Sequence, residues 1–493
     1  MRRRVAPEGA LWTRLIKLSA RSPILHAMLR WMRRRWAYLA GGAALLVGAA
    51  VAIYLTVGQR PGDVLNTNVP FTAPAPAPPP PAKKKPKAPA AANWPLYGYD
   101  MQRTHYMPAA DAKWVKPPYK QVWARSFHNL MEFQPSIHGG QMFFIVNNGT
   151  AYSLRTTTGR ILWKRKIGSL AASSPTWYQG KVYFTTLSGR LTAVNAKNGH
   201  IVWAKDVGAR TESPPLAYRG RVYFGAENDN VYAVNAATGK QIWVYHAAGD
   251  VTSGPAFSKG LLYFGDYGGN VQAVRASNGS LVWKTHEAGL PFGRSGGFYG
   301  TPAIAFGRVY VGNLDSKVYS FDASNGKLAW SHSTGGYVYA APAVAAVPGV
   351  TPTVFVGSYD HRFYALNARD GGVRWTYSAS GPISGAASVI GRVVYFSTLD
   401  SLHTYGLDVR NGKVKFSVAR GAYNPAVSDG RWLYITGHSG ETAYEPLHQP
   451  KATAAIGAAS RKAHRKRVLN KRHRRAKHHH HHARKHHHKR KHH

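Results

Sequence analysis

The 493-residue chain contains no cysteine. This absence excludes disulfides, thiolate metal sites, cysteine nucleophiles, covalent c-type haem and a cysteine-linked lipid anchor. Acidic residues are also scarce, since 21 Asp and Glu stand against 65 Lys and Arg and give a formal net charge of +44 with His neutral. Segments with helical periodicity are few, whereas the chain has 50 Gly, 14 Trp and 28 Tyr. This composition favours a β-rich protein.

The positive charge is concentrated at the two ends of the chain. Residues 1–35 hold ten Lys and Arg with one acid, and residues 451–493 hold sixteen with none, together with twelve of the 24 His. Residues 57–92 add five basic residues and one acid, which leaves 34 basic and 19 acidic residues in 93–450. The central part of the chain is therefore only moderately basic.

Residues 36–57 form a 22-residue run without a charged side chain, WAYLAGGAALLVGAAVAIYLTV. A helix of this length reaches about 33 Å, enough to span the ~30 Å hydrocarbon layer of a bilayer. Because Arg33, Arg34 and Arg35 precede the run, the positive-inside rule predicts a single-pass anchor in the cell membrane, with residues 1–35 cytoplasmic and the rest outside. A cleaved signal peptide is the alternative, but the basic lead is long and no A-x-A site follows the run.

Two further segments lack the composition of a folded domain. Residues 58–92 include PFTAPAPAPPPP, which favours an extended polyproline II linker. Residues 451–493 are predicted to be a disordered tail, because like charges repel one another. This tail is expected to contact polyanions non-specifically, without specific binding of nucleic acid. Imidazoles suit Zn²⁺, Ni²⁺ or Cu²⁺, so weak metal binding is expected at one run in the tail: His478, His479, His480, His481 and His482.

An internal repeat occupies most of residues 93–450. Apolar triplets of strand type recur in steps of 40, 40, 40, 47, 45, 40 and 39 residues. The first seven are each followed by a glycine, which we expect to close a hairpin with positive φ, and then by an aromatic residue that fills the gap between neighbouring sheets. These pairs are Gly159 and Trp163, Gly199 and Trp203, Gly239 and Trp243, Gly279 and Trp283, Gly326 and Trp330, Gly371 and Trp375, and Gly412 and Phe416. A period near 40 with four strands per unit is typical of a β-propeller.

The eighth copy of the repeat is incomplete. No Gly and Trp follow at the expected places near residues 450 and 454, whereas Trp123 stands 40 residues before Trp163 without a repeat of its own. We expect residues 120–127 to supply the missing outer strand of the eighth blade. The predicted fold is therefore all-β, an eight-bladed propeller of four-stranded blades closed by strands from both ends, monomeric, and preceded by one transmembrane helix.

The repeat motif is a small residue, an aliphatic residue and Asn, then Gly and Trp at fixed spacing, as in residues 193–203, 233–243 and 365–375. Together with the segment WPLYGYDMQRT at 94–104, it resembles the quinoprotein-like family of eight-bladed propellers, which carry pyrroloquinoline-quinone-type repeats. The resemblance implies one of two kinds of protein. The family includes quinone-dependent dehydrogenases and cofactor-free scaffolds such as the outer-membrane assembly lipoprotein.

In the dehydrogenase branch, the resemblance implies a disulfide between neighbouring Cys, a Ca²⁺ held by acidic and amide oxygens, and a catalytic Asp. The disulfide cannot exist here, and no position matches the other two, although Glu227, Asp229 and Asn230 could hold a cation or form an ordinary turn. Four acids follow the apolar triplets, where a hairpin turn favours Asp: Asp266, Asp315, Asp360 and Asp400.

We therefore expect no catalytic residue and no cofactor, and assign no cofactor-binding residue. The expected function is a non-catalytic binding or scaffold module of the cell envelope. The alternative is a dehydrogenase of alcohols or sugars that uses pyrroloquinoline quinone and Ca²⁺.

Two loops are longer than the repeat requires, at residues 287–299 and 345–353. The first combines an arginine with aromatic residues, a set enriched at protein interfaces. We predict that it contacts an envelope protein, and a flexible loop without function is the alternative. Its candidate residues are Phe292, Arg294, Phe298 and Tyr299. Loops that precede other strands offer five more polar residues, most of which we expect to be satisfied by local hydrogen bonds: Arg210, Glu212, Asp250, Tyr337 and Tyr339.

Overall fold

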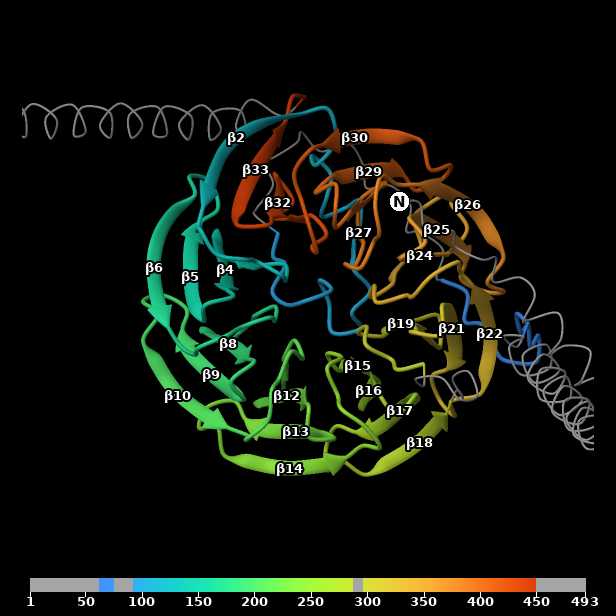
Figure 1. The fold of residues 1–493 in the computed structure, drawn as a ribbon, viewed down its shortest axis with the longest axis horizontal. Helices are drawn as coiled ribbons and strands as arrows, with labels where there is room; N and C mark the ends of the chain where they lie inside the picture. The colour runs from blue at the N-terminus through green and yellow to red at the C-terminus, as the bar shows by residue number, and fades with distance from the viewer. Residues whose placement is uncertain (1–61, 75–91, 287–295, 449–493) are drawn as a thin grey trace, which may run out of the picture. The chain divides into compact units, whose positions relative to one another are not determined.

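The computed structural model describes residues 62–74, 92–286 and 296–448. In this part of the chain, eight sheets surround a central axis (Figure 1), which confirms the all-β, eight-bladed propeller. None of the helices among these residues is long and apolar enough to cross a membrane. The predicted span 36–57 lies outside the described residues, as do the segments 1–35 and 451–493.

The first four blades follow one another along the chain, each from its innermost to its outermost strand. Blade 1 consists of β3 (Ser136–His138), β4 (Gln141–Val146), β5 (Thr150–Arg155) and β6 (Arg160–Lys166). Blade 2 consists of β7 (Thr176–Tyr178), β8 (Lys181–Thr186), β9 (Arg190–Asn195) and β10 (Ile201–Asp206). Blade 3 consists of β11 (Leu216–Tyr218), β12 (Arg221–Ala226), β13 (Asn230–Asn235) and β14 (Gln241–His246). Blade 4 consists of β15 (Ala256–Ser258), β16 (Leu261–Gly265), β17 (Asn270–Arg275) and β18 (Leu281–His286).

The remaining blades keep this order, except that the last one takes its outermost strand from the start of the propeller. Blade 5 consists of β19 (Ala303–Ala305), β20 (Arg308–Gly312), β21 (Lys317–Asp322) and β22 (Leu328–Ser333). Blade 6 consists of β23 (Ala343–Ala345), β24 (Thr353–Gly357), β25 (Arg362–Asn367) and β26 (Val373–Ser378). Blade 7 consists of β27 (Ser388–Ile390), β28 (Val393–Ser397), β29 (Thr404–Asp408) and β30 (Val414–Val418), with β1 (Tyr106–Met107) added parallel to β27. Blade 8 consists of β31 (Val427–Ser428), β32 (Leu433–Gly437), β33 (Gly440–Pro446) and β2 (Tyr119–Ser126).

The glycine and the tryptophan of the repeat meet across the boundary between two blades. Gly199 of blade 2 has a φ of +70°, and a Cβ atom there would lie 2.6 Å from Cδ2 of Trp163 in blade 1. The indole N–H of Trp163 donates to the carbonyl of Ala196, 2.9 Å away. Only glycine therefore satisfies both the turn and the ring that covers it. The other glycines covered by the tryptophan of the preceding blade are Gly159, Gly239, Gly279, Gly326, Gly371 and Gly412.

The carbonyl that receives the indole N–H often accepts a second hydrogen bond. The oxygen of Ala236 accepts from Nε1 of Trp203 at 3.1 Å and from the hydroxyl of Tyr183 at 2.9 Å. Both donors belong to blade 2, whereas the acceptor belongs to blade 3. Equivalent double contacts hold the next three boundaries at Ala276, Ala323 and Ala368. Each boundary thus combines aromatic burial with satisfied polar groups.

The ring closes as the incomplete eighth repeat predicts. Strand β2 pairs antiparallel with β33, with Trp123 opposite Ala443, and Figure 1 shows it on the outside of blade 8. Trp123 is 2% exposed, and its Nε1 donates to the carbonyl of Thr156 in blade 1 at 2.8 Å. The boundary between blades 7 and 8 differs, because Phe416 has no N–H. There the hydroxyls of Tyr119 and Tyr395 lie 2.7 Å apart.

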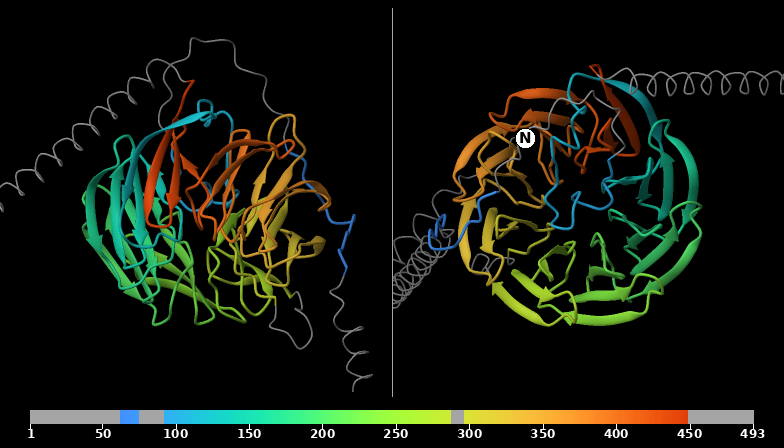
Figure 2. Two further views of the ribbon diagram at one scale, coloured as in Figure 1. Left: turned by 45° about the horizontal axis from the view of Figure 1, so that its top comes forward. Right: turned by 180° about the vertical axis from the view of Figure 1, so that it is seen from behind.

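Residues 92–107 run through the centre of the ring, visible in blue in Figures 1 and 2. Trp94 pairs with Ile137 of β3, and other residues of the segment accept backbone hydrogen bonds from the innermost strands of blades 2, 4, 5, 6 and 7. Blade 3 is reached through the buried Arg103, which donates to the carbonyls of Pro214 and Pro215 at 3.1 Å. Burial lowers the pKa of Arg103 to about 9. We call this segment the plug, because it crosses the channel that the blades surround.

Part of the predicted linker lies on the propeller. Residues 63–74, which we call the strap, follow the outer edge of blade 5. Asn66 donates its N–H to Ala329 and Val64 accepts from Ser331, at 2.7 and 2.9 Å. Val69 is 3% exposed, and its carbonyl accepts from Arg308 at 2.7 Å. Within the predicted linker 58–92, this segment therefore pairs with the propeller, because the outermost strand of a blade has an open edge that an extended segment can join.

The first prediction concerns ring closure. Replacing Trp123 by Ala should lower the free energy of unfolding of the full chain by about 3–5 kcal/mol, the usual loss for a large buried aromatic residue. Trp123→Phe keeps most of the ring but leaves the Thr156 carbonyl without its donor, so it should cost about 1–3 kcal/mol. Urea denaturation measures both changes.

A matched control for this prediction is Ile201→Ala, at a site on β10 that is 49% exposed. It should change the stability by only about 0.5 kcal/mol. If Trp123→Ala unfolds at the same urea concentration as the parent chain, β2 does not close the ring.

Candidate functional site

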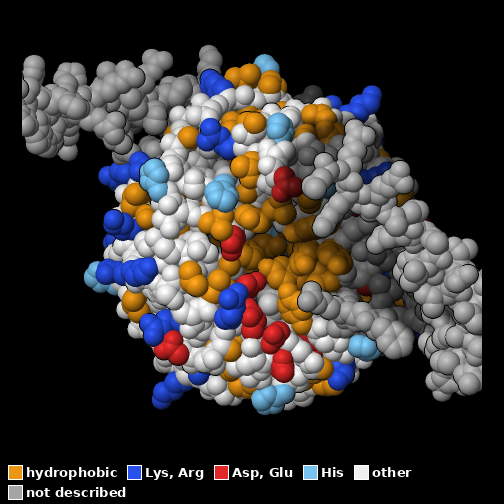
Figure 3. Space-filling view, in the orientation of Figure 1, with side chains coloured by type: hydrophobic (Ala, Val, Ile, Leu, Met, Phe, Trp, Pro, Cys, Tyr) orange, Lys and Arg blue, Asp and Glu red, His pale blue; other side chains and the backbone are white. Residues whose placement is uncertain are grey.

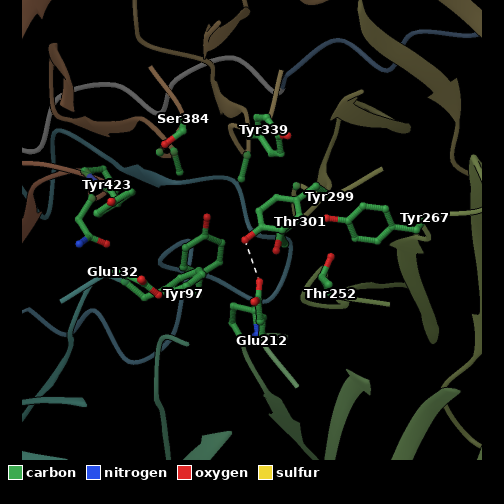
Figure 4. Close-up of a pocket in the computed structure, with 18 of the residues that line it drawn as sticks. Tyr97, Glu132, Glu212, Thr252, Tyr267, Tyr299, Thr301, Tyr339, Ser384 and Tyr423 are labelled. Atoms are coloured by element: carbon green, nitrogen blue, oxygen red, sulfur yellow. Dashed lines mark hydrogen bonds between the residues drawn. The ribbon is translucent and has the colours of Figure 1, made fainter. Parts of the chain in front are cut away.

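A cavity of about 680 Å³ opens on one face of the propeller above the plug. Figure 3 shows it as a hollow at the centre of the ring, with hydrophobic side chains on one side and acidic side chains next to them. Tyr97 of the plug lies at its centre (Figure 4). We call this cavity the funnel. Because the plug crosses the channel beneath it, the funnel is a pocket on one face of the ring.

The side chains of the funnel occupy one recurring position in the repeat. Glu132, Glu212, Thr252 and Tyr339 each stand nine positions after a tryptophan of an outermost strand, and four positions before an innermost strand begins. Ser384 occupies the same position. In two loops of different length, the residue four positions before the innermost strand is Tyr299, after the long insertion, and Tyr423, after a shortened loop. Counting nine positions from the tryptophan could have identified Glu132, Glu212, Thr252, Tyr339 and Ser384 from the sequence.

One wall of the funnel is built of tyrosines. Tyr299 lies with its ring centroid 6.2 Å from Tyr267 and 5.4 Å from Tyr339, and Tyr339 lies 5.0 Å from Tyr359. The first two pairs are edge-to-face, so ring faces and ring edges alternate along the wall. Burial, together with the nearby Glu212, raises the pKa of Tyr267 to about 12. The phenol of Tyr267 therefore stays neutral at physiological pH.

The wall next to the tyrosines is acidic. Arg210 lies between two carboxylates, 3.2 Å from Glu212 and 3.0 Å from Glu227. Glu212 also accepts a hydrogen bond from the hydroxyl of Tyr299 at 2.9 Å, which joins the two walls (Figure 4). Burial raises the pKa of Glu132 and of Asp250, and neighbouring carboxylates raise both further.

Of the four predicted interface residues, the structure describes two, and these lie in different surroundings. Phe292 and Arg294 lie outside the described residues. Phe298 is fully buried, with its ring centroid 5.9 Å from that of Tyr319, so it belongs to the core between blades 4 and 5. Tyr299 lines the funnel. Partner binding by this set stays a prediction.

Of the five polar residues predicted in other loops, four lie in the funnel. Arg210, Glu212, Asp250 and Tyr339 all line the funnel, whereas Tyr337 is 52% exposed and is not part of its lining. Sequence reasoning missed Tyr97, Glu132 and the remaining tyrosines, since it treated each loop separately. The plug residue Tyr97 has no counterpart in the repeat, so no periodicity could have identified it.

The structure also places the recurring acids and the candidate cation ligands. Asp266 accepts the N–H of Asn270 at 2.9 Å, and Asp315 and Asp360 each accept an N–H two residues on at 2.9 Å, which confirms their interpretation as turn residues. Glu227 is paired with Arg210. Across the ranges that the structure describes, no group of three or more His, Asp or Glu side chains could hold a metal ion. His478–His482 lie outside those ranges.

Comparisons with solved structures agree with the fold. BamB from Moraxella catarrhalis superposes with a TM-score of 0.56 at 17% identity, over 66% of this chain and all of that one. A europium-containing methanol dehydrogenase gives 0.61 at 13% identity, over 72% of this chain and 98% of that one. The quinohemoprotein alcohol dehydrogenase from Comamonas testosteroni gives 0.60 at 15% identity, over 73% and 81%. At these identities the likeness shows the fold alone.

The sequence itself identifies the family. No curated protein sequence matches the chain. The family described as outer membrane protein assembly factor BamB matches at residues 120–225, 147–338 and 340–456. Since these segments together cover more than half of the chain, the protein belongs to the BamB-like family of quinoprotein-type propellers.

Proposed function

We propose that the protein is a non-catalytic scaffold of the cell envelope, anchored in the membrane by residues 36–57, that binds its partners on the funnel face of the propeller. The observation that carries this proposal is the funnel. Seven loops that connect blades each place the residue at the same repeat position in its lining, and the plug beneath them is hydrogen-bonded to the blades. Such a site is preorganised, because the blades and not the ligand hold its loops in place. Membership of a family that is described as an outer membrane protein assembly factor supports a role in binding other envelope proteins.

The charge of the funnel argues against the dehydrogenase alternative. Pyrroloquinoline quinone is a tricarboxylate, so its binding needs cationic groups or a metal ion. Among the described lining residues Arg210 is the single cation, and Glu212 and Glu227 already share it. Glu132 and Asp250 add further negative charge. The residues present do not fit an anionic quinone.

The test of this proposal uses the full chain with pyrroloquinoline quinone and Ca²⁺. We expect no saturable binding by fluorescence titration and no dye-linked oxidation of alcohols or sugars. Saturable binding with turnover would instead establish the dehydrogenase.

The proposed topology places the propeller outside the cell membrane, and envelope polyanions would then contact the basic tail. The tail would also bind Zn²⁺ or Ni²⁺ weakly through His478–His482. The funnel would not take part in polyanion binding, because its walls are acidic and neutral.

The absence of cysteine makes the topology directly measurable. Lys413→Cys introduces a single thiol at an exposed hairpin of blade 7, and Ser19→Cys introduces one in the basic segment. A membrane-impermeant maleimide should label Cys at 413 in intact spheroplasts and Cys at 19 only after lysis. The parent chain is the blank, since it has no thiol. The opposite labelling pattern would contradict the orientation and the localisation together.

A further inference from the structure

The funnel carries an excess of negative charge in a strongly basic protein. Arg210 neutralises part of the pair Glu212 and Glu227, but neither Glu132 nor Asp250 forms an ion pair with another described residue. Burial raises the pKa of both, and the repulsion of neighbouring carboxylates raises it further. A positive charge in the funnel would relieve that repulsion.

The tyrosine wall adjoins these carboxylates in the same cavity. The face of an aromatic ring attracts cations, and the same rings provide apolar surface for the methylene groups of a flexible chain. Tyr267, Tyr299 and Tyr339 present such surface, and the hydroxyl of Tyr299 donates to Glu212 at 2.9 Å (Figure 4). A ligand that combines a positive charge with a short aliphatic chain would therefore contact both walls.

A buried hydroxyl between the walls gives an independent indication of a ligand. Thr252 is only 7% exposed, and its Oγ1 has no hydrogen-bond partner among the described residues. It lines the funnel and points into it in Figure 4, unlike Thr301, whose hydroxyl accepts the N–H of Gly254 at 2.9 Å. Buried polar groups without partners are rare in native proteins. An ammonium or guanidinium N–H could donate to this oxygen.

We infer that the funnel is a binding site for an organic cation, a primary ammonium or guanidinium group on a flexible aliphatic chain. Its volume of about 680 Å³ is that of a small-molecule site. This inference rests on the proposed function only in taking the funnel face as the binding face. Two sources of this chemistry are a free polyamine and the protein's own tail, since residues 451–493 contain sixteen Lys and Arg and no acid.

Calorimetric titration with spermine tests the inference, using the full chain and a variant that lacks residues 451–493. The truncation leaves all eight sheets complete, because β33 ends at Pro446. Glu212→Gln combined with Asp250→Asn should weaken spermine binding to the truncated chain by about tenfold, as expected for the loss of two charges beside the ligand. Thr252→Val, which replaces only the hydroxyl, should weaken it severalfold.

Matched controls decide whether the effect belongs to the funnel. Asp206→Asn combined with Asp408→Asn removes the same charge from exposed or half-buried sites outside the funnel and should leave the affinity unchanged.

Tighter binding by the truncated chain than by the full chain identifies the tail as the internal occupant, and equal binding identifies a free cation. Absence of binding by the truncated chain, or equal affinity of parent and funnel variants, overturns the inference. None of these outcomes depends on quinone binding or turnover.

Discussion

The contact between a tryptophan of one blade and a glycine of the next sets the geometry of the whole ring. The indole ring covers a glycine whose Cβ would collide with it, and the indole N–H reaches a carbonyl of the same neighbouring blade. The turn geometry of the glycine, the burial of the indole ring and the indole hydrogen bond thus act together at seven of the eight boundaries between blades. The eighth boundary, between blades 7 and 8, replaces the tryptophan by Phe416 and uses a pair of tyrosine hydroxyls.

Because these contacts fix the blades, the loops above them are free to vary. The position nine residues after each tryptophan carries Glu132 and Glu212 on one side of the funnel and Tyr339 on the other. The contacts that hold the blades together and the side chains that line the funnel therefore occupy different positions of one repeat. The plug completes the arrangement, since it bonds to the innermost strands of most blades and crosses the channel below the site.

The fold could be predicted from the sequence because its causes recur every 40 residues. Trp123 stood at the right distance from Trp163 to indicate closure, and the structure confirms it. The strap could not be predicted, since its pairing with the edge of blade 5 is a single event without repetition. The funnel was predicted only in part. Individual loop residues such as Glu212 were recognised, but their convergence depends on the closed ring, and Phe298 belongs to the core instead.

Basic residues are concentrated at the two ends of the sequence, whereas four carboxylates line the funnel: Glu132, Glu212, Glu227 and Asp250. We propose that ligand binding occurs there while the blades stay rigid. Hydrogen–deuterium exchange of the full chain with and without spermine tests it most directly. The account predicts slower exchange confined to the funnel loops, such as residues 248–254 and 337–341, with unchanged exchange in the outermost strands. Protection spread over the outer strands, or none in the funnel loops, would contradict it.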